Sequence, residues 1–182
     1  MNVKEKREKK IEYMLEAFIP LFSKHGMDKT SIKMLADSVD RNVALLYQYF
    51  VDKDDMIAKC TQYHHNKIEE ELITILFNNI DNPDRMCRAT LEFIDSKRDI
   101  CRFLVQVLAH PTYSFFAEES GEKISLQLKD FSTILKEKYK VSTETALGIS
   151  FGINSIINNY ILRENKEIFL LQFNVLIAPL CR

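Results

Sequence analysis

Apolar residues recur at intervals of three and four positions along most of the chain, and only four glycines and four prolines interrupt them. This spacing places apolar side chains on one face of a helix, whereas the strict alternation typical of strands is scarce. The pattern therefore predicts an all-α protein with about nine helices. The expected helices are residues 4–24, 32–39, 43–50, 52–78, 83–96, 98–109, from 115 or 120 to 139, from 142 or 143 to 163, and 166–178.

Residues that cap or stop helices support these boundaries in the first third of the chain. Gly26 follows the first apolar run and is expected to end that helix. Thr30 or Ser31, Asn42 and Asp52 each precede an apolar run. Their side-chain oxygens accept hydrogen bonds from the free amides at a helix start. We therefore expect three helices within the first fifty residues and about six after them.

Composition describes an ordinary globular chain. Its 182 residues are 46% hydrophobic and 28% charged, which is enough apolar material for a compact core. The net charge is −1, so no overall basic excess indicates a nucleic-acid partner, although a local patch is sufficient for one. Five lysines and arginines fall within the opening "MNVKEKREKK". This run is either an arm that contacts phosphates or a solvated helix start.

The cysteines and the hydropathy pattern favour a cytoplasmic protein. Cys60, Cys87, Cys101 and Cys181 lie far apart without a Cys-x-x-Cys pair, which argues against a disulfide framework or a closed zinc site. The N-terminus is charged rather than apolar. The most apolar stretch, residues 168–180, is too short for a membrane span and contains Gln and Asn.

The two short helices expected at 32–39 and 43–50 match a helix-turn-helix. A tight turn joins them, and both carry apolar residues that hold them against the first helix. By itself this signal is weak, because helical hairpins are common in all-α proteins.

The run "LFSKHGMDKTSIKMLADSVDRNVALLYQYFVDKDDM", residues 21–56, resembles the N-terminal domain of TetR-family transcriptional repressors. The features similar in order and spacing are Leu21, Phe22, Gly26, Thr30, Ser31, Ile32, Leu35, Ala36, Leu46, Tyr47, Tyr49, Phe50 and Lys53. The resemblance implies a homodimer whose two recognition helices enter successive major grooves of a palindromic double-stranded operator. It also implies a helix-turn-helix domain at 1–51, and a helical ligand-binding and dimerisation domain at 52–182 that begins with a linking helix at about 52–78.

The resemblance also implies which residues contact DNA. Thr30 and Ser31 are expected near the DNA backbone, and Lys33 at a base or a phosphate, while Asn42 caps the recognition helix. The residues expected at base edges are Val43, Ala44, Leu45 and Gln48, and those expected at phosphates are Tyr47, Tyr49 and Lys53.

Several of these positions depart from the family pattern. Asp40 stands in the turn where Gly is usual, and apolar residues or Gln stand where the family often has Lys, Gly, Thr or Arg. Fewer charges predict a shallower salt dependence of binding. Methyl contacts to thymine and one Gln amide predict half-sites rich in A·T pairs. The alternative is that Leu45 and Leu46 both pack inward and that DNA binding is weak or lost.

A small-molecule pocket is implied for the C-terminal two-thirds, which hold many aromatic residues. The candidate lining residues are Cys60, His64, Phe93, Phe103, Tyr113, Phe116, Phe131, Asn154 and Asn158. The alternative is that the aromatic residues form core, and that Asn154 and Asn158 fix the register of a helix. Cys60 and His64 lie one turn apart, but single buried Cys and His residues usually pack, so neither a metal nor a cofactor is expected.

The last two helices are expected to form the dimer face as half of a four-helix bundle. They are apolar nearly all round, and the spacing Gly148-x-x-x-Gly152 allows a close helix approach. The candidate residues are Gly148, Ile149, Gly152, Ile153, Ile156, Tyr160, Phe169, Phe173 and Leu176. The alternative is complete burial within the monomer.

These observations favour a ligand-responsive repressor that binds operator DNA as a homodimer and is released by a small, largely apolar effector. A helical dimer that senses a ligand or a protein partner without specific DNA binding is the alternative. An enzyme is disfavoured, because the chain has no phosphate-binding glycine loop, no Gly-x-Ser-x-Gly and no His-Glu-x-x-His.

Overall fold

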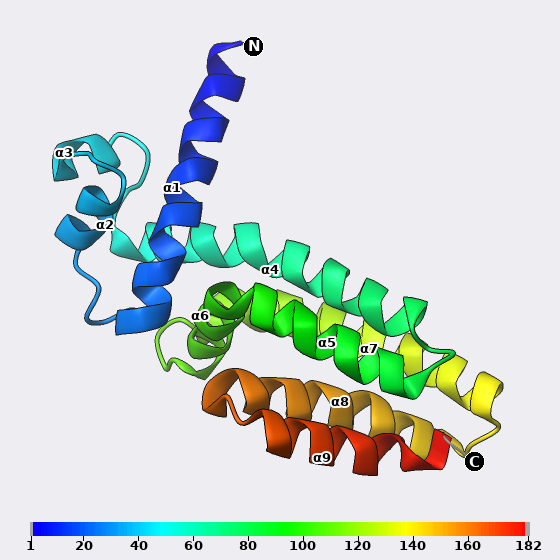
Figure 1. Ribbon diagram of the computed structural model, residues 1–182. Coiled ribbons are helices and arrows are strands. Elements are labelled where there is room, and N and C mark those ends of the chain that lie inside the picture. Colours follow the sequence, from blue (N-terminus) through cyan, green and yellow to red (C-terminus); the bar gives the residue numbers. More distant parts are fainter. Residues whose placement is uncertain (1, 181–182) are drawn as a thin grey trace. The chain divides into compact units, whose positions relative to one another are not determined.

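The computed structural model describes the backbone of residues 2–180 and the side chains of all of these except residues 66 and 117–120. Every regular element in this range is helical, so the all-α prediction is confirmed (Figure 1). No helix formed by these residues combines the length and the apolar character that a membrane span requires. The elements are α1 (Val3–His25), α2 (Ile32–Ser38), α3 (Val43–Leu46), α4 (Lys53–Asn78), α5 (Pro83–Ser96), α6 (Arg98–Ala109), η1 (Ser114–Ala117), α7 (Glu118–Tyr139), α8 (Thr143–Arg163), α9 (Lys166–Ile177) and η2 (Ala178–Leu180).

Side-chain caps set the helix starts around the helix-turn-helix. Asn42 Oδ1 accepts a hydrogen bond from the Leu45 amide at 2.8 Å, and Ser31 Oγ accepts one from the Met34 amide at 3.2 Å. Of the two candidate caps for α2, Ser31 is therefore the one that acts. Each cap satisfies an amide that has no partner inside its own helix.

The third helix is shorter than predicted. Residues 43–50 were expected to be helical throughout, but α3 ends at Leu46 and a turn follows. The Gln48 and Tyr49 amides donate to carbonyls only three residues back, at 3.0 and 2.9 Å. This tighter coil brings the buried Phe50 ring to 5.8 Å from Phe18 of α1. Packing of Phe50 in the core therefore overrides continuation of the helix.

The chain divides into two compact units. The first unit comprises Met1–Lys67 and Asp99–Ala117, and the second comprises Ile68–Arg98 and Glu118–Arg182. The division does not fall between residues 51 and 52, where the sequence placed a domain boundary. The reason is visible inside the first unit, where the Phe103 ring of α6 stacks on Phe22 of α1 with centroids 5.5 Å apart.

The second unit is built around α8, which packs against both α7 and α9. Ser150 is fully buried, and its hydroxyl donates to the Leu128 carbonyl of α7 at 2.5 Å. On the other side of α8, a Cβ atom at Gly152 would lie 2.8 Å from both methyl carbons of Leu176 in α9. Glycine at 152 thus allows α9 to approach closely.

Candidate nucleic-acid interface

The turn between α2 and α3 gives the helix-turn-helix its shape. Asp40 adopts φ 51°, in the left-handed region, and the Arg41 amide donates to the Ala36 carbonyl at 3.0 Å. Aspartate tolerates this conformation better than most residues, so it can stand where glycine is usual. The turn directs Asn42 and α3 outward from the first unit, and both Asn42 and Ala44 are exposed.

Most of the residues predicted to contact DNA are accessible to solvent in the first unit. The exposed ones are Ser31, Lys33, Asn42, Ala44, Tyr47 and Gln48, and the half-buried ones are Val43, Leu45, Tyr49 and Lys53. A groove of about 690 Å³ is lined by Lys33, Ala36, Asp37, Asp40, Arg41, Asn42 and Val43. The structure thus brings Lys33 of α2 beside the start of α3.

Two of these predicted contacts have structural roles instead. Thr30 is completely buried, and its hydroxyl donates to the Gly26 carbonyl at 2.7 Å. The Lys53 ammonium donates to the carbonyls of Met27 at 2.9 Å and Thr30 at 3.3 Å. Both side chains therefore hold the loop between α1 and α2, because backbone carbonyls of that loop have no helical partners. The buried Thr30 hydroxyl is thus turned away from solvent, whereas a DNA contact of Lys53 stays a prediction.

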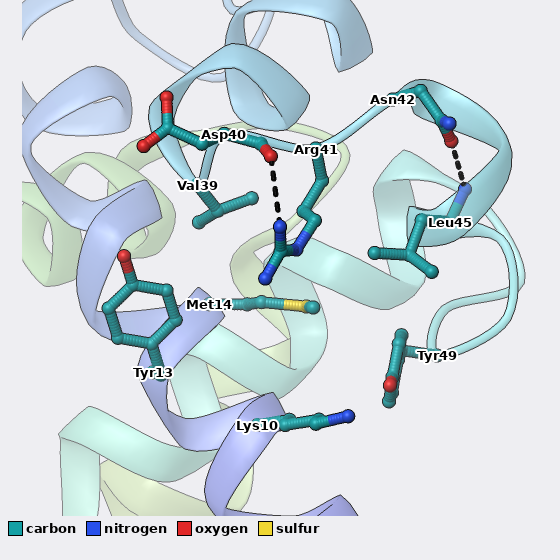
Figure 2. A pocket seen from close by; sticks show the side chains of 9 residues that line it. All are labelled: Lys10, Tyr13, Met14, Val39, Asp40, Arg41, Asn42, Leu45 and Tyr49. Carbon is teal, nitrogen blue, oxygen red and sulfur yellow. Dashed lines mark hydrogen bonds between the residues drawn. The ribbon is translucent and has the colours of Figure 1, made fainter.

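Leu45 also departs from its expected role. It lines a cavity together with Met14 and Lys10 of α1, so its side chain is directed at α1 (Figure 2). Leu46 is fully buried. Both leucines thus pack inward, and Ala44, Tyr47 and Gln48 remain exposed.

Arg7 is a contact that sequence reasoning missed. Its guanidinium donates to the Gln48 carbonyl at 2.8 Å and lies over the Tyr49 ring, 5.0 Å from the centroid. The helix that carries Arg7 is capped by Asn2, whose side chain accepts from the Glu5 amide at 2.8 Å. The only signal in the sequence was the basic run at the N-terminus, which does not reveal a partner 41 residues away.

The cavity between α1 and the α2–α3 turn has a volume of about 510 Å³. Its lining residues are Lys10, Tyr13, Met14, Val39, Asp40, Arg41, Asn42, Leu45 and Tyr49. Figure 2 shows Tyr13, Arg41, Tyr49 and Lys10 arranged around Met14. The walls are therefore basic and phenolic, and the floor is apolar.

The residues predicted to line an effector pocket are distributed over both units. Those in the first unit are Cys60, His64, Phe103, Tyr113 and Phe116, and those in the second are Phe93, Phe131, Asn154 and Asn158. Several make core contacts, such as the Phe131 ring 5.3 Å from Phe77. Burial raises the pKa of the Cys60 thiol well above its usual range, which keeps it neutral. Their role in an effector pocket stays a prediction.

Most of the dimer face predicted on α8 and α9 is covered within the chain itself. Six of its residues are buried inside the chain itself: Ile149, Ile153, Ile156, Tyr160, Phe169 and Phe173. Leu176 is half-buried against Gly152, so the close helix approach is to α9 of the same chain. The cause is that α8 lies between two helices of its own unit, which cover its most apolar side.

A different apolar stripe is exposed on these helices. We call it the α8–α9 outer face, and its residues are Gly148, Phe151 and Leu162 of α8 with Ile168, Leu171 and Val175 of α9. The members from α9 are three and four residues apart, so they share one side of that helix. Leu171 and Val175 are 65% and 68% exposed, which is high for large apolar side chains.

Comparisons with known proteins agree with this architecture. Residues 15–60 match the sequence family described as bacterial regulatory proteins, tetR family. The chain is also similar to the HTH-type transcriptional regulator HbdR of Aromatoleum sp. (strain CIB), with 27% identity over 95 residues. That alignment covers 50% of this chain and 42% of the relative, so it spans less than half of the relative's length.

Solved structures share the fold over nearly the whole chain. A transcriptional regulator from Rhodococcus sp. Rha1 has a TM-score of 0.72 at 14% identity, covering 92% of this chain and 94% of its own. A transcriptional regulator of the TerR/AcrR family from Aquifex aeolicus VF5 has a TM-score of 0.63 at 19% identity, covering 94% and 97%. At such low identity these likenesses establish the fold alone.

A helix-turn-helix followed by further helices, with the outer side of α3 exposed, is the architecture of helix-turn-helix transcriptional regulators. Residues 15–60 therefore form a DNA-binding domain of the TetR type, and the chain as a whole has the fold of TetR-family transcriptional regulators. Regulators of the TetR family bind DNA and are not enzymes.

Proposed function

We propose that this regulator is a repressor that binds a palindromic operator as a homodimer and leaves it when a small, largely apolar effector binds. In this proposal the helix-turn-helix of the first unit binds DNA, and helices of the second unit form the dimer interface. The observation that carries DNA binding is that Ala44, Tyr47 and Gln48 are exposed in and directly after α3, while Lys33 lines a groove with Val43 at the start of α3. None of these side chains is buried in the core of the first unit.

Base reading is assigned to the side chains at the outer side of α3. Gln48 carries a donor and an acceptor, which suits an adenine edge, and the methyl groups of Val43 and Ala44 suit thymine. The Tyr47 hydroxyl, on a ring that is 50% exposed, suits a phosphate oxygen. The expected half-sites are therefore rich in A·T pairs.

Dimerisation is assigned to the α8–α9 outer face. A second copy of the chain suits this face, because two such stripes related by a two-fold axis bury the same apolar residues on both sides. A palindromic operator requires two reading surfaces with the same symmetry. Dimerisation is thus also a condition of the proposed DNA binding.

We assign the response to the effector to residues 99–117. In the first unit this segment makes contacts with the loop before α2 and with the start of α4. The Tyr113 hydroxyl donates to Asp54 at the start of α4 at 2.8 Å, and His110 lies 3.3 Å from Asp28 in the loop before α2. Burial and the bond to Asp54 raise the pKa of Tyr113 to about 12, so it stays a donor at physiological pH. An effector that favours a different position of this segment shifts the population away from the DNA-binding state.

A salt-titrated binding measurement tests the proposal. The full-length protein is used to select duplexes from a random pool, and its affinity for a selected duplex is compared with that for a scrambled one from 50 to 300 mM salt. We expect a preference for the selected duplex that persists across the series, with a modest salt slope.

An equal affinity for both duplexes at low salt overturns operator recognition. That result favours the alternative, a dimeric sensor of a ligand or a protein that does not recognise a DNA sequence. The observation that supports this alternative is that α3 contains neither Arg nor Lys.

A further inference from the structure

The cavity drawn in Figure 2 is not used by the base-reading surface proposed above. Its walls come from two places: Lys10 and Tyr13 belong to α1, whereas Arg41 belongs to the α2–α3 turn. Two cationic side chains from different elements thus border one space. Only Asp40 among the nine lining residues carries a negative charge.

The placement of these charges makes the cavity favourable for an anion. In Figure 2 the guanidinium of Arg41 extends toward Met14 in the centre, whereas the carboxylate of Asp40 is directed away from it. The phenol of Tyr13, which is 61% exposed, adds a hydrogen-bond donor on the α1 side of the cavity. A planar guanidinium, an ammonium and a phenol together match the oxygens of a phosphate group.

The exposure of the walls indicates the size of the occupant. Lys10, Tyr13, Arg41 and Asn42 are all exposed, so the cavity opens broadly to solvent. Pockets for small molecules usually enclose most of their ligand. An open basic cavity suits instead one unit of a polymer whose neighbouring units continue along the surface.

Continuity with the groove on the other flank of the turn identifies the polymer. Asp40, Arg41 and Asn42 line both hollows, with Lys33 on the far flank and Lys10 on the near one. Cations therefore follow each other across the turn that precedes α3, along the edge of the base-reading surface. This row of positive charges fits a DNA strand that crosses the turn and places successive phosphates next to these side chains.

We propose that Lys10 and Arg41, assisted by Tyr13, form a binding site for a backbone phosphate of operator DNA, so that α1 contacts DNA beyond the bases read by α3. This inference rests on the proposed DNA binding and deepens it. The site contributes affinity and salt dependence and leaves base preference unchanged, because a phosphate is the same in every sequence.

The test compares Lys10→Gln, Arg41→Gln and the double variant with the parent on a duplex that the parent selects from a random pool. We expect each single variant to lower the salt slope of log K by about 1 for each protomer engaged, with the order of preferred bases retained. Lys9→Gln is the matched control, since Lys9 is exposed on the same helix and does not line the cavity. It should change the slope by less than half as much.

Asp40→Asn supplies a variant with the opposite effect. Asparagine tolerates the left-handed φ of 51° at this position, so the turn is retained while a negative charge is removed. We expect tighter binding at low salt, by about threefold or more. Circular dichroism and thermal unfolding of each variant check that the helices are intact.

The outcomes separate this inference from the proposed function. A parent-like slope in the double variant, with the parent binding its selected duplex, overturns the phosphate site and leaves operator binding in place. An equal decrease of the salt slope in Lys9→Gln and in the double variant also overturns the phosphate site. The decrease would then come from the general positive charge of α1 and not from a defined site. Failure of the parent to select any duplex overturns the proposed function and this inference with it.

Discussion

Individual side chains around α2 and α3 differ in whether they are bonded within the protein or exposed to solvent. Thr30 and Lys53 hold the loop before α2 through backbone carbonyls, although the resemblance implied that Thr30 lies near the DNA backbone and Lys53 at a phosphate. Tyr47 and Gln48 are exposed and free to meet DNA. The residue type at a position therefore did not settle its role, because a hydroxyl or an ammonium serves a carbonyl as readily as a phosphate.

At Tyr47 and Gln48 the two proposed tasks are separable by substitution. Tyr47→Phe removes one hydroxyl and is expected to weaken binding to all duplexes by about 0.5–1.5 kcal/mol. Gln48→Ala is expected to remove about 1–3 kcal/mol of discrimination at one base pair. Affinities for a panel of single-base variants of a selected duplex measure both effects. A uniform loss for Gln48→Ala would contradict its assignment to base reading.

Arg7 is predicted to position Gln48 rather than to read a base itself. Its bond to the Gln48 carbonyl and its place over the Tyr49 ring restrain the turn that follows α3. Arg7→Ala should therefore relax preference at the same base pair as Gln48→Ala, and the double variant should add little to either single one.

Arg7→Lys keeps the charge but not the planar fork and is expected to recover only part of the preference. If Arg7→Ala changes the salt slope and not the base preference, Arg7 is only a charge near DNA.

At the scale of elements, packing rather than periodicity decided which sides of α8 and α9 are exposed. Both helices are apolar on more than one side, so the sequence offered several faces for dimerisation. The structure covers Ile149 and Ile153 with neighbouring helices of the same unit and leaves Phe151 and Leu171 exposed. Gly148 and Gly152, which look equivalent in the sequence, are therefore in different surroundings.

The two glycines predict opposite effects on stability. A Cβ at Gly148 meets nothing within 4 Å, so Gly148→Ala should raise the free energy of unfolding by up to about 1 kcal/mol through helix propensity. A Cβ at Gly152 would lie 2.8 Å from both Leu176 methyl carbons, so Gly152→Ala should lower it by about 1 kcal/mol or more. Chemical denaturation of the two variants measures the difference.

Leu176→Ala removes the obstructing methyl groups and provides the control for Gly152→Ala. In the Leu176→Ala protein, Gly152→Ala should lower the free energy of unfolding by less than it does in the parent. The difference between the two changes measures the coupling between positions 152 and 176. Equal costs on both backgrounds would show that Leu176 does not restrict position 152.

At the scale of the whole molecule, α4 belongs to both units, and the chain contributes to the first unit twice. The segment 99–117 returns to the first unit and bonds there through Tyr113 and Asp99, whose carboxylate accepts from Ser23 at 2.9 Å. A boundary drawn after residue 51 separates residues that pack together. Contacts between segments so far apart in the chain cannot be predicted from a local sequence pattern.

Charge on the α8–α9 outer face is predicted to separate the protomers without unfolding them. Leu171→Glu places a carboxylate on a surface that the homodimer would remove from water, so the dimer should dissociate at micromolar concentration. Leu126→Glu on α7 is the matched control, since Leu126 is 62% exposed and lies outside this face.

Sedimentation equilibrium measures both variants, and specific DNA affinity should fall with the dimer. A dimeric Leu171→Glu protein would place the interface elsewhere.

What the sequence determined by itself is local. Helices, their caps at Ser31 and Asn42, and the left-handed turn at Asp40 depend on residues three or four positions apart, so they could be read from spacing. The resemblance at residues 21–56 extended this to the family, which the comparisons confirmed.

Only the tertiary structure decided which side chains contact groups far away in the chain, and which apolar helix faces are covered by other helices. Arg7 reaches a carbonyl 41 residues away, and α8 buries one apolar side and exposes another. Neither outcome is encoded in a single helix, because hydrophobic burial is non-directional and depends on what the rest of the chain places nearby.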